Sequence, residues 1–156
     1  MCKLCWTLFT LLVLTTAGIT YQVVVLGNVE TAPDGRVALQ LTQQERNLVL
    51  SEMRDFLTAV QKIIDATNRQ EMQAAAAAAR KVGMAAQTSV PPGLIAKLPL
   101  EFKQLGFDTH RKFDALALDA EQLGDPDHTR NELSSLMANC IACHAAYSLV
   151  LDNPSR

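Results

Sequence analysis

The residues with the clearest chemistry are the two cysteines and the histidine of the run Cys140-Ile141-Ala142-Cys143-His144. On a helix, positions i, i+3 and i+4 share one face, so both thiols and the imidazole would project together. Two cysteines at this spacing, followed directly by histidine, are the attachment signature of a c-type haem. The sequence therefore predicts one covalent haem c, held by Cys140 and Cys143, with His144 as the proximal iron ligand.

Two other kinds of site also use a Cys-x-x-Cys pair. A zinc site needs two more convergent ligands, and the only other histidines are His110 and His128, with the remaining cysteines, Cys2 and Cys5, at the far end of the chain. A thioredoxin-like dithiol usually opens a helix within a βαβ unit, whereas this pair lies deep in a C-terminal helical segment. A non-haem helical adaptor with a redox-active or structural pair stays open as an alternative.

Four predicted helices must position the motif. The first starts at a capping box, with Thr42 as N-cap and Glu45 three residues later. The second, near residues 69–88, contains six consecutive alanines, which are the strongest helix formers. The apolar residues of the first helix recur with helical period and predict one buried face: Val49, Met53, Phe56, Leu57, Val60, Ile63 and Ile64.

The third and fourth helices have clear ends. The third is expected over residues 99–123, closed by Gly124, and the fourth runs from the pair Asp125-Pro126 to about residue 150. No segment shows strand periodicity, and the last two connections are short. The expected fold is all-α, an antiparallel four-helix bundle over residues 41–156.

The N-terminal segment has the composition of a membrane-spanning or export segment. Residues 4–26 carry no charge and would span about 34 Å as a helix, enough to cross a hydrocarbon core of about 30 Å. Lys3 precedes the segment and acidic residues follow it, which places the N-terminus in the cytoplasm. We therefore expect a transmembrane signal anchor at residues 1–26, a stalk at 27–40 and a domain on the periplasmic side of a bacterial inner membrane. A signal peptide cleaved near Ala17, leaving a soluble periplasmic protein, is the alternative.

Composition limits the other functions. A chain of 156 residues has room for one domain, and its 14 basic against 16 acidic residues provide no basic field for nucleic acid. No Ser-His-Asp set, paired-carboxylate cleft or glycine-rich phosphate loop appears, so no enzyme is expected. Bundle domains with an apolar outer stripe often dimerise, which makes a homodimer a further candidate state.

The C-terminal pattern resembles that of a known family. The run Cys140-x-x-Cys143-His144-x-x-Tyr147, near the end of the last of four helices, is similar to the C-terminal motif of the cytochrome c-prime superfamily, including its low-spin, methionine-ligated members. The stretch 102–114 resembles the third helix of that family. The resemblance implies a four-helix-bundle cytochrome that exchanges electrons with redox protein partners.

The resemblance covers roughly residues 40–150 and has one departure. Ser148 stands where many members carry a basic residue beside the proximal histidine, which weakens any transfer of their gas chemistry to this chain. In the family, electron carriers place a methionine from the first helix on the distal side of iron, whereas gas binders keep an apolar side chain there. Met53 is the candidate distal ligand. If Arg46 corresponds to the first-helix arginine of the family, Leu50 takes that place instead and Met53 is ordinary core.

The predicted function is a monohaem c-type cytochrome in periplasmic electron transfer, with a membrane contact through the N-terminal segment. The alternative is a five-coordinate binder of nitric oxide or other diatomic gases. His110, beside Arg111 and Lys112, is expected to be a solvated helix residue, and His128 has no evident task.

Overall fold

The computed structural model describes residues 3–152, and Cys2 of the N-terminal cysteine pair lies outside them. These residues are mostly helical, with a small sheet. The helices are α1 Lys3–Tyr21, α2 Gln43–Asn68, α3 Met72–Arg80, α4 Pro92–Lys97, α5 Leu100–Leu123 and α6 Pro126–Ala146. A π-helical segment η1 (Gln22–Leu26) extends α1, and a 3₁₀ segment η2 (Met84–Ser89) follows α3. The strands are β1 Val29–Thr31, β2 Val37–Leu41 and β3 Tyr147–Leu151.

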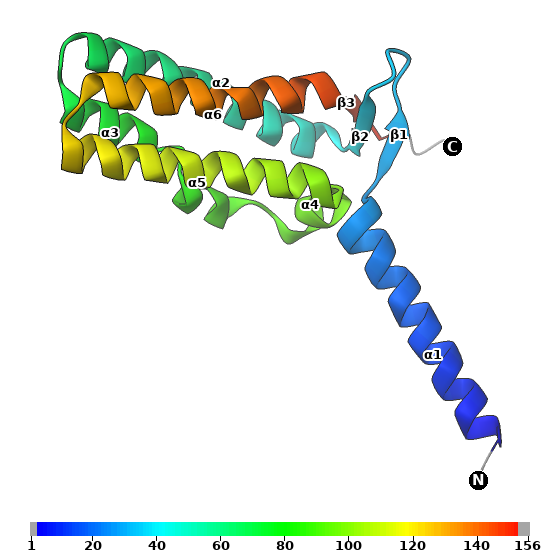
Figure 1. Cartoon of the computed structure of the whole chain (residues 1–156). Helices are drawn as coiled ribbons and strands as arrows, with labels where there is room; N and C mark the ends of the chain where they lie inside the picture. The colour runs from blue at the N-terminus through cyan, green and yellow to red at the C-terminus, as the bar shows by residue number, and fades with distance from the viewer. Residues whose placement is uncertain (1–2, 153–156) are drawn as a thin grey trace.

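Four helices enclose the main core. In Figure 1, α2 and α5 run in one direction, and α3 and α6 run beside them in the other. Alanines fill much of the core, so the helices approach closely, and Phe113 is its largest fully buried side chain. The ring of Phe113 stacks on Phe56 of α2, with centroids 5.4 Å apart. This packing joins α2 to α5 at the centre of the molecule.

The predicted caps at the start of α2 and α6 and the predicted end of α5 are confirmed. Thr42 Oγ1 accepts a hydrogen bond from the Glu45 backbone N–H (3.3 Å), and Glu45 Oε2 accepts one from the Thr42 backbone N–H (2.8 Å). Asp125 caps α6 by accepting from the backbone N–H groups of the second and third residues after it. Gly124 ends α5 in the left-handed conformation, with φ of 62°. Each signal acts over four residues or fewer, so the sequence carries it locally.

The second predicted helix is shorter than expected. The sequence predicted a helix that continues to residue 88. Instead, α3 ends at Arg80, and the chain turns at Gly83 into η2. A Cβ atom at Gly83 would lie 1.8 Å from Asp114 Oδ1 of α5. Asp114 Oδ2 accepts a hydrogen bond from the Met84 backbone N–H (2.9 Å), which holds the turned segment against α5.

Much of the segment 27–40, which the sequence predicted as a stalk, forms strands of a small sheet. β1 and β2 form an antiparallel hairpin, and β3 adds to β2 in parallel, with Val37 opposite Tyr147 and Leu41 opposite Leu151. The prediction of an all-α chain without strands was therefore wrong for these segments. Leu39 and Leu41 of β2 are fully buried in a second core cluster with apolar residues of α2 and α4.

The last helix also ends earlier than predicted, at Ala146 where residue 150 was expected. Arg36, in the turn between β1 and β2, donates from Nη1 to the backbone carbonyls of His144 (3.2 Å) and Tyr147 (3.1 Å). These carbonyls belong to the helix C-terminus, which attracts a cation. The hairpin therefore ends α6 just after the cysteine-histidine motif.

The apolar stripe of α2 is narrower than predicted. Val49, Val60 and Ile63 are buried and Phe56 is half-buried, but Leu57 is 70% exposed and Ile64 is 42% exposed. Both residues lie at the edge of the stripe, beyond the reach of the neighbouring helices.

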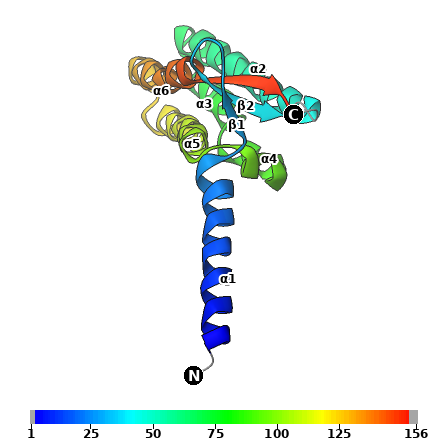
Figure 2. The same ribbon diagram turned by 90° about the vertical axis from the view of Figure 1, so that its right-hand side faces the viewer.

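The N-terminal helix stands away from the other elements (Figures 1 and 2). Residues Lys3–Leu26 form a helix of 24 residues with a mean hydropathy of 1.8 and no buried residue in its most apolar window, long and apolar enough to cross a membrane. A signal sequence near an N-terminus has the same properties. Its junction with the domain is tight, because the Asn28 backbone N–H donates to the Lys97 carbonyl (2.6 Å) and Lys103 Nζ donates to the carbonyls of Val23 and Val24 (3.2 and 3.1 Å).

Candidate functional site

The motif residues lie in the last two turns of α6. The side chains of Cys140 and Cys143 are half-buried, and His144 is exposed. Neither thiol is in a disulfide. Cys140 packs against the main core, so α6 presents one sulfur toward the interior and the imidazole toward solvent. The three residues therefore lie within two turns of one helix, but the side chains of Cys140 and His144 do not share one environment.

The environment of the two thiols does not suit thiolate chemistry. Burial raises the pKa of Cys140, and burial together with the nearby Cys140 raises the pKa of Cys143. Redox-active dithiols depend on a lowered pKa, because the thiolate is the nucleophile. Neither shift is in the direction that activates a thiol, which weighs against a thioredoxin-like dithiol.

His144 has a fixed backbone and an unengaged ring. Its carbonyl accepts the hydrogen bond from Arg36, whereas no residue among 3–152 hydrogen-bonds to its imidazole. Both ring nitrogens of His144 are thus available to an external ligand.

A polar network fixes α6 immediately before the motif. The buried Asn139 accepts a hydrogen bond from Lys112 Nζ (3.0 Å) and donates to Asp108 Oδ2 (2.9 Å) and Thr109 Oγ1 (3.2 Å), all on α5. The hydrogen bonds from Lys112 and Asn139 lower the pKa of the Asp108 carboxyl. The rotation of α6 is therefore set one residue before Cys140, and with it the direction of the motif side chains.

The surface beside the motif is apolar. Ile141 lies between the cysteines and is 70% exposed, and Met137, one turn earlier, is also exposed. Tyr147 follows the motif and packs edge-on against Phe102 of α5, with centroids 5.1 Å apart. A flat apolar group attached through the two sulfurs would cover apolar side chains that water now meets.

The candidate distal residues both belong to α2. Met53 and Leu50 are each half-buried, so burial does not favour one over the other. The contacts between α2 and α6 are sparser than those that join α2 to α3 or α5 to α6. A group attached to α6 and placed between α6 and α2 would therefore occupy the least tightly packed of these three helix interfaces.

The donors present suit a c-type haem. The motif supplies two thiols outside any disulfide and an exposed imidazole, which are the residue types of a c-type haem site, beside exposed apolar side chains. Cys140 and Cys143 would hold the group and His144 would be its axial ligand.

A separate cavity lies on the other side of α2 and α5. Its volume is about 400 Å³, and it is lined by residues of α2, α3, η2, α4 and α5, with no residue of α6 in its lining. Phe56 and Phe102 line it; Phe56 also packs against the main core, and Phe102 packs against Tyr147 of β3. Neither Met53 nor Leu50 lines this cavity.

His110 lies in the wall of this cavity, and the prediction that it is solvated was wrong. It is 2% exposed, and its Nδ1 lies 2.7 Å from the Val82 carbonyl. Its Nε2 lies 2.6 Å from Gln87 Nε2 and 3.3 Å from Glu52 Oε1. Burial lowers the pKa of His110, but the hydrogen bonds to Glu52 and Val82 and the Glu52 charge outweigh it, so the pKa is raised.

The burial of His110 could have been inferred from its spacing to other buried residues of the same helix. His110 lies three residues before Phe113 and seven before Ala117, both fully buried. Arg111 and Lys112, its charged neighbours, lie on other faces of α5, so their charge does not indicate whether the face of His110 is exposed.

Comparison of the chain with protein-family models, curated proteins and solved structures found no match.

Proposed function

We propose that the protein is a monohaem c-type cytochrome that transfers electrons between redox protein partners. The observation that carries the proposal is the set of Cys140, Cys143 and His144 near the end of α6, with unpaired thiols, an unengaged imidazole and exposed apolar side chains beside them. The haem would supply one-electron chemistry. The chain would attach it through the two sulfurs, ligate iron through His144 and exclude water with apolar side chains.

The arrangement of the helices supports a cytochrome c-prime-like bundle. α2, α3, α5 and α6 alternate in direction around one core, and the motif lies in the last of them (Figure 1). η2 and α4 take the place of the second half of the second helix. The sheet formed by the hairpin and β3 is an addition to that plan, and it sets where α6 ends.

The N-terminal helix supports a membrane-bound location with the domain on the periplasmic side, where c-type haem is attached. Lys103 Nζ donates to the carbonyls of Val23 and Val24 at the end of this helix, and the Lys97 carbonyl accepts from the Asn28 backbone N–H just after it, so the domain would sit close to the membrane surface. Cleavage near Ala17 would leave this junction intact and release a soluble form.

Covalent haem is tested directly by expression of the full chain together with haem-attachment machinery, followed by denaturing electrophoresis with haem staining and pyridine haemochrome spectra. We expect about one haem per chain. The variant Cys140→Ala/Cys143→Ala should lose the covalent signal, and Cys5→Ala, a cysteine outside the motif, should keep it. Absence of covalent haem in the wild type would refute the proposal and leave the helical adaptor.

The distal side decides between the electron carrier and the gas binder. Met53→Ala and Leu50→Ala form a matched pair, because both side chains are half-buried on α2. If Met53 ligates iron, the wild-type ferric protein is low-spin, Met53→Ala becomes high-spin and binds carbon monoxide, and Leu50→Ala stays low-spin. A wild-type protein that is already high-spin and binds carbon monoxide would support the nitric-oxide binder, with Leu50 on the distal side.

A further inference from the structure

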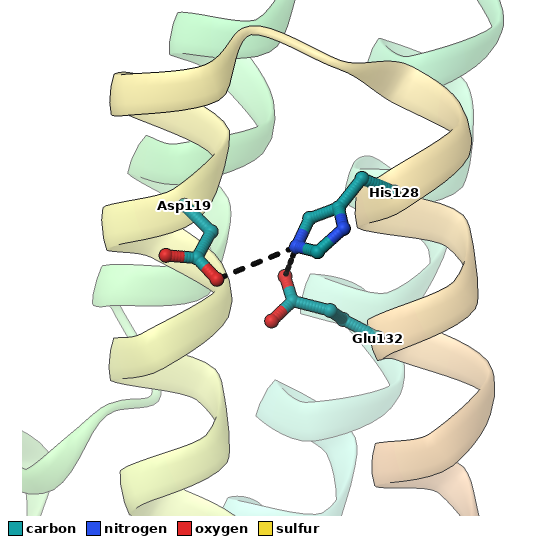
Figure 3. A group of neighbouring side chains, drawn as sticks. All are labelled: Asp119, His128 and Glu132. Carbon is teal, nitrogen blue, oxygen red and sulfur yellow. Dashed lines mark hydrogen bonds and ion pairs between the residues drawn. The ribbon is translucent and has the colours of Figure 1, made fainter.

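A second group of ligand-type side chains lies at the opposite end of α6. Figure 3 shows Asp119 of α5 facing His128 and Glu132 of α6. His128 Nε2 is 3.4 Å from Asp119 Oδ2 and 3.7 Å from Glu132 Oε2. One ligand atom from each residue lies within 4.8 Å of the other two, and all three residues are half-buried. This spacing brings one nitrogen and two oxygens around a common point.

The cluster is not satisfied by its own contacts. Glu132 Oε2 is buried and accepts no hydrogen bond from residues 3–152. A buried polar atom without a partner costs free energy, and so do two carboxylates held close together. A positive charge between them would satisfy the orphaned oxygen and remove the repulsion at once.

We propose that Asp119, His128 and Glu132 bind one divalent transition-metal ion, of which zinc is the best fit. Imidazole nitrogen and carboxylate oxygen are both ligands of zinc, and three protein ligands leave one tetrahedral position for water. His128 and Glu132 lie at i and i+4 on one helix, which places both donors on the same face.

The ion would cross-link α5 to α6 next to the turn at Gly124. His144 lies 16 residues after His128, which is about 24 Å along the helix, so this site is separate from the cysteine-histidine motif. The proposal does not depend on haem. Its role would be to stabilise the end of the molecule that the sheet does not reach (Figure 1).

The test is a titration of the full-length protein, in detergent and first stripped of metal, with zinc in a calorimeter. We expect one saturable site that involves these residues. Glu132→Gln should weaken binding by about 100-fold, because it removes one of three ligands. The matched control is Asp127→Asn, a carboxylate in the same part of α6 that is 82% exposed, pairs with Arg130 and is not one of the three ligands. This control should bind zinc as the wild type does.

Thermal unfolding separates a metal site from a structural role. Zinc at about 100 times its dissociation constant should raise the Tm of the wild type by about 5–10 °C, and it should not raise that of Glu132→Gln. Without metal, Glu132→Gln should be at least as stable as the wild type, because it removes the repulsion with Asp119. A Glu132→Gln variant that is less stable without metal and unchanged in affinity would overturn the proposal.

Binding at the cysteines must be distinguished as well. Cobalt(II) bound to thiolate gives intense sulfur-to-metal charge-transfer bands, whereas nitrogen and oxygen ligands give only weak visible bands. We expect the weak bands alone, also in Cys140→Ala/Cys143→Ala. Charge-transfer bands that disappear in that variant would place the ion on the motif and refute the site at Asp119.

Discussion

The contact between Glu52 and His110 makes the stability of the protein depend on pH. The pKa of folded His110 is raised above its ordinary value of 6.5. Below pH 6.5 the imidazole is protonated in both the folded and the unfolded chain, so the stabilisation by Glu52 is fully present. As the pH rises through the folded pKa, the proton leaves and this stabilisation is lost.

The substitution Glu52→Gln removes the charge and leaves burial as the main influence on His110. Its pKa should then fall below 6.5, because burial disfavours the imidazolium. At low pH the variant must bury a charge without its anion, and hydrogen bonds to charged groups contribute about 1.5–3 kcal/mol. We expect Glu52→Gln to cost that amount near pH 5.5 and less than about 1 kcal/mol near pH 9.

The measurement is the free energy of unfolding by denaturant at both pH values, with the imidazole titration followed by NMR. Asp55→Asn is the matched control, since Asp55 lies on the same helix and lines the same cavity but is exposed. The other charged residues of the lining are Lys62, Lys81 and Lys103. A cost for Glu52→Gln that is the same at both pH values, or that grows as the pH rises, would refute the reasoning.

Three further substitutions test the fold, each through the free energy of unfolding. Phe113→Ala should cost about 3–5 kcal/mol, because the ring is fully buried and no neighbour can fill the space; a cost below about 1 kcal/mol would mean that the core collapses around it. Gly83→Ala should cost about 1–3 kcal/mol, because its Cβ would overlap Asp114, whereas Gly93→Ala, with no atom near its Cβ, should be tolerated. Thr42→Ala should cost about 0.5–2 kcal/mol through loss of the cap on α2, and an unchanged stability would contradict the importance of that cap.

Part of the candidate site could be predicted from the sequence. The spacing from Cys140 to His144 is local and places the three residues within two turns of one helix, whereas the packing of α6 decides that Cys140 contacts the core and His144 is exposed. The attached haem, the electron-transfer function and the role of Met53 remain predictions. The burial of His110 could also have been predicted from its register with Phe113, had helical period been given more weight than its charged neighbours.

The metal-type cluster could not be predicted in this way. His128 and Glu132 are one turn apart in the sequence, but Asp119 belongs to another helix. Only the packing of α5 against α6 after the turn at Gly124 brings its carboxylate to them.

What the sequence by itself determined are the features whose causes lie within one or two helical turns: the caps at Thr42 and Asp125, the stop at Gly124 and the apolar N-terminal helix. The pairing of β2 with β3 was decided only by the tertiary structure. It joins residues 37–41 to residues 147–151, and neither strand is stable without a neighbour. Because that pairing and Arg36 end α6 at Ala146, the long-range contacts fix where the cysteine-histidine motif lies, whereas the local sequence fixes only what it contains.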